Sequence, residues 1–452
     1  MPKANDFFLK NSPPEVKACS RAAPKGREYD EEFSHQPGGI RIDEVALAMQ
    51  LAALSITDDK EGTLAQIGEA NPWHIEALKM LTGSEEEAHK PLSQILDEYY
   101  GLVVDAHINE SGFRGTYAID TQGYIAHNDD IIVVSFRCTT TIKDWITNLT
   151  LLDSVWEPEE DLSNGHSGYF SFLDGLCGGS EMKPRVHTGF YNNFLAVLPI
   201  LKEHVDPLLS RNAPPRKLYI VGHSLGAGIA AMAGCYYLLH HDWTASPHRL
   251  VNAMAGCPRP CHESMAQVVQ DKLSYLRPLD KISMFHITLN EDVVPTVPPA
   301  WLGFRHIDKL VYITEDNAVL IGPQINDDKI LDENEVKQMG DSYPDVTTLR
   351  ETTEETQSDY DKLISYIPTA FRDHMPDFYL RPLIDLFERI HGVITPKEES
   401  EVLEENVEQD EMSYKSIHVN KRRFRKKIDM LTGCVPRRGR AMDNVMISPQ
   451  LA

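Results

Sequence analysis

The residues best suited to covalent chemistry form the pentapeptide Gly222-His223-Ser224-Leu225-Gly226. The apolar run 218–221 precedes it, and small or apolar residues follow it through residue 232. This order predicts a buried strand, a sharp turn and a helix packed closely on the sheet. Such a turn exposes the serine hydroxyl, and it needs both glycines because a Cβ there would collide with the neighbouring strand and helix. Ser224 is therefore the predicted nucleophile.

A nucleophilic serine needs an imidazole as its general base and a carboxylate that holds the imidazole. After a strand-turn-helix nucleophile, the acid comes next along the chain and the histidine last. Asp292 follows the predicted strand 283–289 in a loop that ends at a proline, and it is the predicted acid. The alternatives are that Asp292 is only a turn residue, or that Asp280, at the entrance of the same strand, is the acid.

Two histidines that follow Asp292 are candidates for the base. His374 lies at a predicted loop-to-helix boundary, where an imidazole can reach over the sheet. His306 is the alternative, in the turn 303–306 that leads into another predicted strand. We predict His374 as the base, and we interpret His223 as a packing residue because it points away from the position a base would need.

Acyl transfer also requires donors for the developing oxyanion, usually two backbone N–H groups. Leu225 is expected to supply one, and Thr139, at the end of the buried strand 131–136, the other. The following segment, 142–152, places apolar side chains on one helical face. It is either an ordinary surface helix or a lid over a groove, and the residues on its apolar face are Ile142, Trp145, Ile146 and Leu149.

The elements around these residues alternate between helices and strands. Helical spacing is expected over residues 42–56, 73–81, 92–104, 191–204 and 366–388. Strands are expected from residue 116 to 136, with turns at 121–123 and 128–130, and at 218–221, 248–255, 283–289 and, at the sheet edge, 309–314. This order predicts an α/β fold with a mostly parallel sheet, helices on its faces and reactive residues at its carboxyl edge.

The composition changes at both ends of the chain. Residues 1–40 are rich in proline, glycine and charge and are expected to be disordered, 41–395 to form one domain, and 396–452 to form a flexible tail. Within the domain, 153–183 is expected to be a loop and 315–361 an acidic insertion. The tail is acidic and then basic at 420–427. That basic cluster is either solvated or in contact with an anionic membrane or lipid-droplet surface.

The overall charge and the cysteines set limits on function. Lys and Arg number 44 against 68 Asp and Glu, a formal charge of −24, which argues against nucleic acid as a partner. Seven cysteines show no paired framework, no secretory leader or membrane span is evident, and no metal or cofactor motif is found. We therefore expect a soluble, cytoplasmic protein without cofactor or metal.

Five segments in this order resemble the class-three lipases, which are α/β-hydrolases typified by secreted fungal triacylglycerol lipases. They are VVSFRCTTTIKDWITNLT, VHTGF, YIVGHSLGAG, NEDVVPTVPPAWLGFRH and RDHMPDFY, and the likeness covers roughly residues 90–390. The resemblance implies Ser224 as nucleophile, Asp292 as acid, His374 as base, Thr139 and Leu225 at the oxyanion hole and residues 142–152 as the lid. It also argues against His306.

The resemblance implies a serine hydrolase that cleaves acylglycerol esters. Alternatives are a phospholipase, a galactolipase or a soluble carboxylesterase of the same fold, and a non-catalytic scaffold protein. Cys138 stands where family members usually have glycine, and residues 153–183 and 315–361 are longer than in the secreted fungal enzymes. These departures affect the oxyanion loop, the lid and the size of the substrate.

Overall fold

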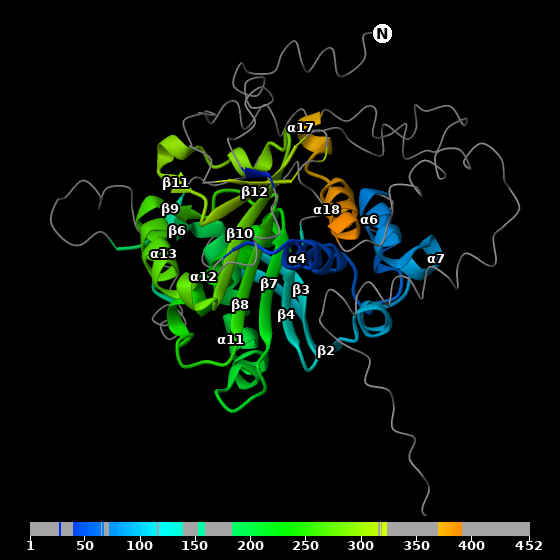
Figure 1. Cartoon of the computed structure of the whole chain (residues 1–452), viewed down its shortest axis with the longest axis horizontal. Coiled ribbons are helices and arrows are strands. Elements are labelled where there is room, and N and C mark those ends of the chain that lie inside the picture. Colours follow the sequence, from blue (N-terminus) through cyan, green and yellow to red (C-terminus); the bar gives the residue numbers. More distant parts are fainter. Residues whose placement is uncertain are drawn as a thin grey trace, which may run out of the picture.

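A nine-stranded sheet runs through the centre of the molecule (Figure 1). This computed structural model describes residues 27–28, 39–64, 66, 72–114, 117–138, 152–158, 183–314, 317, 319–322 and 369–390. The strand order is β1-β13-β12-β10-β8-β7-β4-β3-β2. The strands are β1 Arg27–Glu28, β2 Val103–Arg114, β3 Tyr117–His127, β4 Ile131–Phe136, β7 Lys217–His223, β8 Arg249–Ala255, β10 Ile282–Leu289, β12 Lys309–Ile313 and β13 Val319–Gly322.

The five neighbouring strands β4, β7, β8, β10 and β12 are parallel, and the outer strands pair antiparallel. Every residue of β4, β8 and β10 is buried, which explains why these strands are mostly apolar and lack a regular alternation of apolar and polar residues. Alternate residues serve opposite faces: Ile131 and Val133 join one apolar cluster, whereas Ile132 and Val134 join the other.

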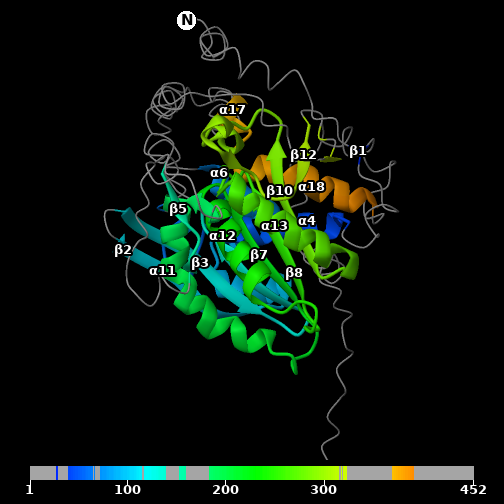
Figure 2. The ribbon, with the colours of Figure 1, turned by 90° about the vertical axis from the view of Figure 1, so that its left-hand side faces the viewer.

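Helices cover both faces of the sheet, as Figures 1 and 2 show. One face packs against α4 (Ile42–Leu54), α6 (Pro72–Thr82), α8 (Leu92–Ile95), the π-helix η1 (Leu96–Tyr100) and α18 (Pro376–Ile390). The other face packs against α11 (Thr188–His204), α12 (Leu225–His240) and α13 (Glu263–Leu276). Short helices complete the set: α7 Glu85–Ala88, η3 Asp206–Leu209, η4 Arg277–Leu279, η5 Val294–Thr296, η6 Ala300–Leu302 and α17 Thr369–Arg372.

A second, four-stranded sheet joins the loops that leave the carboxyl ends of the main strands. Its order is β11-β9-β6-β5, and all its pairings are antiparallel. The strands are β5 Asp153–Val155, β6 Arg185–His187, β9 Cys261–His262 and β11 Phe304–Arg305. The sheet therefore ties together the segments that follow β4, β8 and β10.

The expected α/β-hydrolase fold class is confirmed, with a mostly parallel sheet between two helical layers. Three local expectations are wrong. Residues 121–123 do not turn but continue β3, and Gly123 lies where a Cβ would be 2.1 Å from the Ser135 oxygen. Strand β12 is not an edge, because β13 and then β1 extend the sheet. Residues 103–104, expected in a helix, begin β2.

The expected domain boundaries stay predictions. Within 1–40 the structure describes only 27–28 and 39–40, and the first pair forms β1 against β13. The tail 396–452, with its basic cluster 420–427, lies outside the described residues. Most of the expected loop 153–183 and most of the acidic insertion 315–361 also lie outside the described residues, although 153–155 form β5 and 319–322 form β13.

Candidate active site

The turn between β7 and α12 places Ser224 in a strained backbone conformation. Its φ is 58° and its ψ −126°, a region that non-glycine residues rarely adopt. A Cβ on Gly222 would lie 2.3 Å from the Gly226 carbonyl, and a Cβ on Gly226 would lie 2.3 Å from the Phe136 oxygen. Both glycines are therefore required for the helix to start this close to the sheet.

One imidazole connects this serine to a carboxylate. His374 Nε2 lies 2.8 Å from Ser224 Oγ, and His374 Nδ1 lies 2.8 Å from Asp292 Oδ2. Because the carboxylate is an acceptor, Nδ1 carries the proton and Nε2 accepts from the serine hydroxyl. Ser224 and His374 are fully buried, and Asp292 is 4% exposed. The structure thus brings together three residues that the sequence predicts as nucleophile, base and acid.

Asp292 is held by further donors. Its Oδ1 accepts the Val294 N–H at 2.9 Å, and its Oδ2 also accepts the Tyr379 hydroxyl at 2.5 Å. Tyr379 in turn accepts the Leu289 N–H at 3.1 Å, so this buried tyrosine joins the end of β10 to the carboxylate. Burial and Asp292 together raise the pKa of Tyr379 well above its usual value, which keeps the phenol a donor.

Sequence reasoning did not predict Tyr379 or Gly256 as part of this site. Tyr379 lies in α18, five residues after His374. A hydroxyl about one helical turn beyond the predicted base is a sequence pattern from which its role could be predicted. Gly256, the residue after β8, has a φ of 53° and lies where a Cβ would be 2.9 Å from His374 Cε1 and 3.1 Å from Asp292 Oδ2. Only glycine leaves room for the imidazole there.

The alternatives raised by the sequence lie elsewhere. His306 Nε2 donates to the Pro295 carbonyl at 2.8 Å, its ring stacks on His286, and burial lowers its pKa to about 3. Asp280 pairs with Arg41 at 2.6 Å, at the opposite end of β10 from Asp292. His223 stacks on His374 with ring centroids 4.8 Å apart, and burial lowers its pKa, as does the nearby His374.

The expected oxyanion donors are described only in part. Leu225 is the first residue of α12, so its N–H belongs to the free amides at the positive end of a helix of 16 residues. Thr139 lies outside the described residues, as do Ile142, Trp145, Ile146 and Leu149 of the expected lid. Of the segment 142–152, only Leu152 is described, and it is 48% exposed.

Cys138, two residues beyond the end of β4, faces a histidine. Its Sγ lies 3.6 Å from His74 Nε2 of α6. Burial raises the pKa of this thiol to about 11, and it lowers the pKa of His74 to about 3. Both groups are therefore neutral at pH 7, and Cys138 is a poor second nucleophile.

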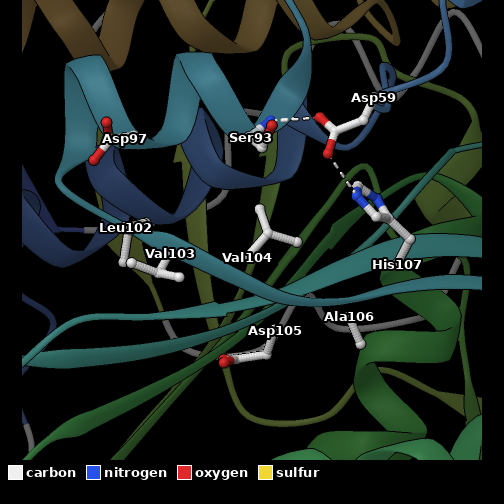
Figure 3. Close-up of a pocket in the computed structure, with 9 residues that line it drawn as sticks. All are labelled: Asp59, Ser93, Asp97, Leu102, Val103, Val104, Asp105, Ala106 and His107. Carbon is white, nitrogen blue, oxygen red and sulfur yellow. Dashed lines mark hydrogen bonds and ion pairs between the residues drawn. The ribbon is translucent and has the colours of Figure 1, made fainter.

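Other features of the described residues do not point to additional chemistry. A pocket of about 510 Å³ lies between η1 and β2, where Asp59 accepts the Ser93 N–H at 2.7 Å and pairs with His107 at 2.9 Å (Figure 3). Neither Ser224, Asp292 nor His374 lines it. Among the described residues no group of three or more His, Cys, Asp or Glu is arranged to hold a metal, and no described helix is both long and apolar enough to cross a membrane.

Comparison with known proteins gives a family and several relatives. Residues 133–301 match the family described as "Lipase (class 3)". The "Secreted mono- and diacylglycerol lipase A" of Penicillium cyclopium is 24% identical over 222 residues, which are 49% of this chain and 60% of the relative. A "Lipase" of Rhizomucor miehei is 27% identical over 208 residues, 45% of this chain and 47% of the relative. The "Secreted mono- and diacylglycerol lipase 1" of Fusarium solani is 29% identical over 175 residues, 39% and 41%.

The matches are partial: the chain spans at most 60% of the length of these three relatives. A solved mono- and diacylglycerol lipase of Aspergillus oryzae aligns over 63% of this chain and 87% of its own, with 21% identity and a TM-score of 0.42. A score this low supports no inference about this chain.

The cytoplasmic location expected from the sequence is wrong on these findings, because the Penicillium and Fusarium relatives are named as secreted. That expectation depended partly on cysteine usage. The described cysteines are free thiols, but Cys235, Cys257 and Cys261 are at most 1% exposed. Thiols so deeply buried are shielded from oxidants and do not report on the compartment. Over residues 133–301 the chain is similar to the class 3 lipase family, and the three relatives named above are lipases.

Proposed function

We propose that this protein is a serine carboxylic-ester hydrolase that acts on acylglycerols. The observation that carries the proposal is the position of His374, whose two ring nitrogens lie 2.8 Å from the Ser224 hydroxyl and 2.8 Å from the Asp292 carboxylate. The acylglycerol class comes from the names of the relatives, which are mono- and diacylglycerol lipases.

The geometry supports a two-step acyl transfer. Ser224 Oγ attacks the ester carbonyl carbon while His374 Nε2 takes its proton, and Asp292 stabilises the imidazolium that forms. The oxyanion binds the Leu225 N–H and, in this proposal, the Thr139 N–H. His374 then gives the proton to the departing glyceride oxygen, which leaves an acyl-enzyme ester on Ser224. Water, deprotonated by His374, releases the fatty acid and restores the serine.

The burial of Ser224 and His374 limits how a substrate can reach them. Ser224 and His374 have no exposed surface in this structure, so an ester must reach them through a change in the covering atoms. The lid of residues 142–152, with Ile142, Trp145, Ile146 and Leu149, remains part of the proposal, as does contact of the protein with a membrane or lipid-droplet surface. A rise in hydrolysis when a soluble ester forms an emulsion would support both. A rate that follows total ester concentration without such a rise would contradict them.

The central test is Ser224→Ala. We expect ester hydrolysis to fall by about 10⁶-fold, because a triad acts as a unit, while the free energy of unfolding changes little. The measurement is release of p-nitrophenol from an acyl ester and of fatty acid from mono-, di- and triacylglycerols. A panel that includes phospholipids and galactolipids separates the alternative substrates.

The chain offers a matched control in His306, a second buried histidine from the same half of the chain. His306→Gln should keep hydrolysis near the wild-type rate, whereas His374→Gln should abolish it. Activity that survives Ser224→Ala would exclude Ser224 as the nucleophile. Wild-type protein that neither hydrolyses esters nor is labelled by a fluorophosphonate would favour a non-catalytic protein on a hydrolase fold.

A further inference from the structure

The residue before the proposed base makes an unusual set of contacts. Asp373 is 2% exposed, and both of its carboxylate oxygens are fully used. Its Oδ1 accepts from Arg372, with Nε at 3.1 Å and Nη2 at 2.9 Å. Its Oδ2 accepts from the loop that holds the proposed acid, with Asn290 Nδ2 at 2.9 Å and the Glu291 N–H at 3.2 Å. Asp373 therefore joins the segment of His374 to the loop of Asp292.

The loop needs such an anchor because of its backbone. Asn290 has a φ of 34°, a left-handed conformation that asparagine adopts more readily than most other non-glycine residues. Tyr312 donates to the Asn290 carbonyl at 3.1 Å, and the Asp292 N–H bonds to the Leu289 carbonyl at 2.8 Å. The chain thus turns sharply between the end of β10 and Asp292, and side chains from outside the loop hold the turn.

We propose that Asp373 is a positioning residue that fixes the distance between Asp292 and His374. This inference rests on the proposed function, since it assigns Asp373 a role in the same site. Asp373 and His374 are consecutive, and the Asp373 N–H is fixed by the Thr369 carbonyl at 2.8 Å. Any shift of the acid loop relative to the imidazole therefore breaks bonds at Asp373 Oδ2.

Only a carboxylate suits this position. Four N–H donors from three residues converge on Asp373, and a carboxylate offers acceptor sites on both oxygens. An asparagine presents one oxygen and one NH₂ group, so either Arg372 or the Asn290–Glu291 pair would face a second donor. The loop would then lose the anchor although the side chain keeps its shape.

The experiment compares Asp373→Asn, Asn290→Gly and the double variant. Glycine accepts a φ of 34° without strain, so Asn290→Gly removes the side-chain bond without changing any charge. We expect each single variant to lower kcat about tenfold with KM unchanged, and to slow fluorophosphonate labelling of Ser224 by a similar factor. The double variant should be no slower than the slower single variant, because both remove the same contact.

Two controls separate positioning from loss of folding. Asp271→Asn changes an exposed aspartate on α13 that accepts only from Gln267 at 2.8 Å, and it should leave kcat and labelling unchanged. Each variant is assayed well below its own melting temperature, where the folded fraction is complete. If Asp373→Asn does not fold, Asn290→Gly alone decides the question.

Unchanged kcat in the single variants, or falls that multiply in the double variant, would overturn the role of Asp373. Failure of the proposed function is distinct, because it appears in the wild type itself as absent ester hydrolysis or as hydrolysis that Ser224→Ala leaves intact.

Discussion

The two ends of the parallel sheet both bury polar side chains, but in different ways. At the amino end, Glu44 of α4 is fully buried and contacts Arg249, Lys217 at 3.1 Å and Arg41 at 3.6 Å. Asp280 joins this amino-edge cluster through Arg41 at 2.6 Å and Arg249 at 3.5 Å. The cluster thus consists of three cations around two carboxylates.

At the carboxyl end, the groups that contact Ser224 and Asp292 form a line instead of a charge cluster. Ser224, His374, Asp292 and Tyr379 are linked in order, and Asp292 is bonded there to groups that are neutral before reaction. Opposite charges in contact hold each other in place, and no proton needs to move between them. A single charge at the end of a row of neutral donors can stabilise a proton that moves onto the imidazole. The comparison teaches that buried polar groups can be arranged either as mutually neutralising charges, which suit stability, or as a hydrogen-bonded line, which suits the proposed chemistry.

The pair of aspartates at the two ends of β10 gives the sharpest test. Asp292→Asn keeps the shape of the site but removes the charge that stabilises the imidazolium, and we expect kcat to fall by about 10⁴-fold. Asp280→Asn, the same change at the other end of the strand, should keep kcat and lower only the free energy of unfolding. Ester hydrolysis and urea denaturation of both variants measure the contrast. Equal losses of activity would show that the two ends do not differ as described.

Glu44, the buried carboxylate at the centre of the amino-edge cluster, is the residue at which the role of the cluster can be tested. Glu44→Gln leaves Arg249 and Lys217 without the buried carboxylate they surround, and removing one partner of a buried pair costs about 3 to 5 kcal/mol. We therefore expect a loss of roughly 3 kcal/mol in the free energy of unfolding, with kcat near wild type under conditions where the variant is folded. A large fall in kcat with unchanged stability would assign the cluster to catalysis and contradict the comparison.

The sequence allowed the main elements and the grouping of Ser224, Asp292 and His374 to be predicted, because each depends on a local pattern or on chain order. The choice of Asp292 over Asp280 followed from which end of a strand each occupies. Strands β5, β6, β9 and β11 have only two or three residues, too few to show a period. Strand β2 is mostly exposed or half-buried, so its residues lack the apolar alternation that marks a strand.

The residues that support the site were harder to predict. Tyr379, Asp373 and Gly256 act through contacts with segments far along the chain; Asn290 and Asp373, for example, are 83 positions apart. Their residue types are ordinary for a helix or a turn, and only the packing of the acid loop against the segment 369–390 gives them a role. Asp373 lies next to a predicted base, which by itself does not indicate a bond to the acid loop.

The pH dependence of stability offers a last test of the difference between the two ends of the sheet. The test uses His74, which lies on the carboxyl side. Burial lowers the pKa of His74 to about 3, against 6.5 in the unfolded chain. Between these values the unfolded chain binds more protons than the folded one, so stability falls as the pH is lowered. One such histidine accounts for roughly 2.5 kcal/mol lost between pH 7 and pH 4.5.

The expected result is that His74→Phe reduces the acid-induced loss of unfolding free energy by roughly that amount, 2.5 kcal/mol, relative to wild type. Urea denaturation at pH 7 and at pH 4.5 measures the difference for both proteins. His107, a half-exposed histidine on β2, is the control, since His107→Phe removes no deeply buried imidazole. An equal acid loss in wild type and His74→Phe would mean that the imidazole beside Cys138 accepts a proton in the folded protein. The carboxyl end would then contain a protonated histidine beside Cys138 in addition to Arg372, and its contrast with the amino-edge cluster would be correspondingly smaller.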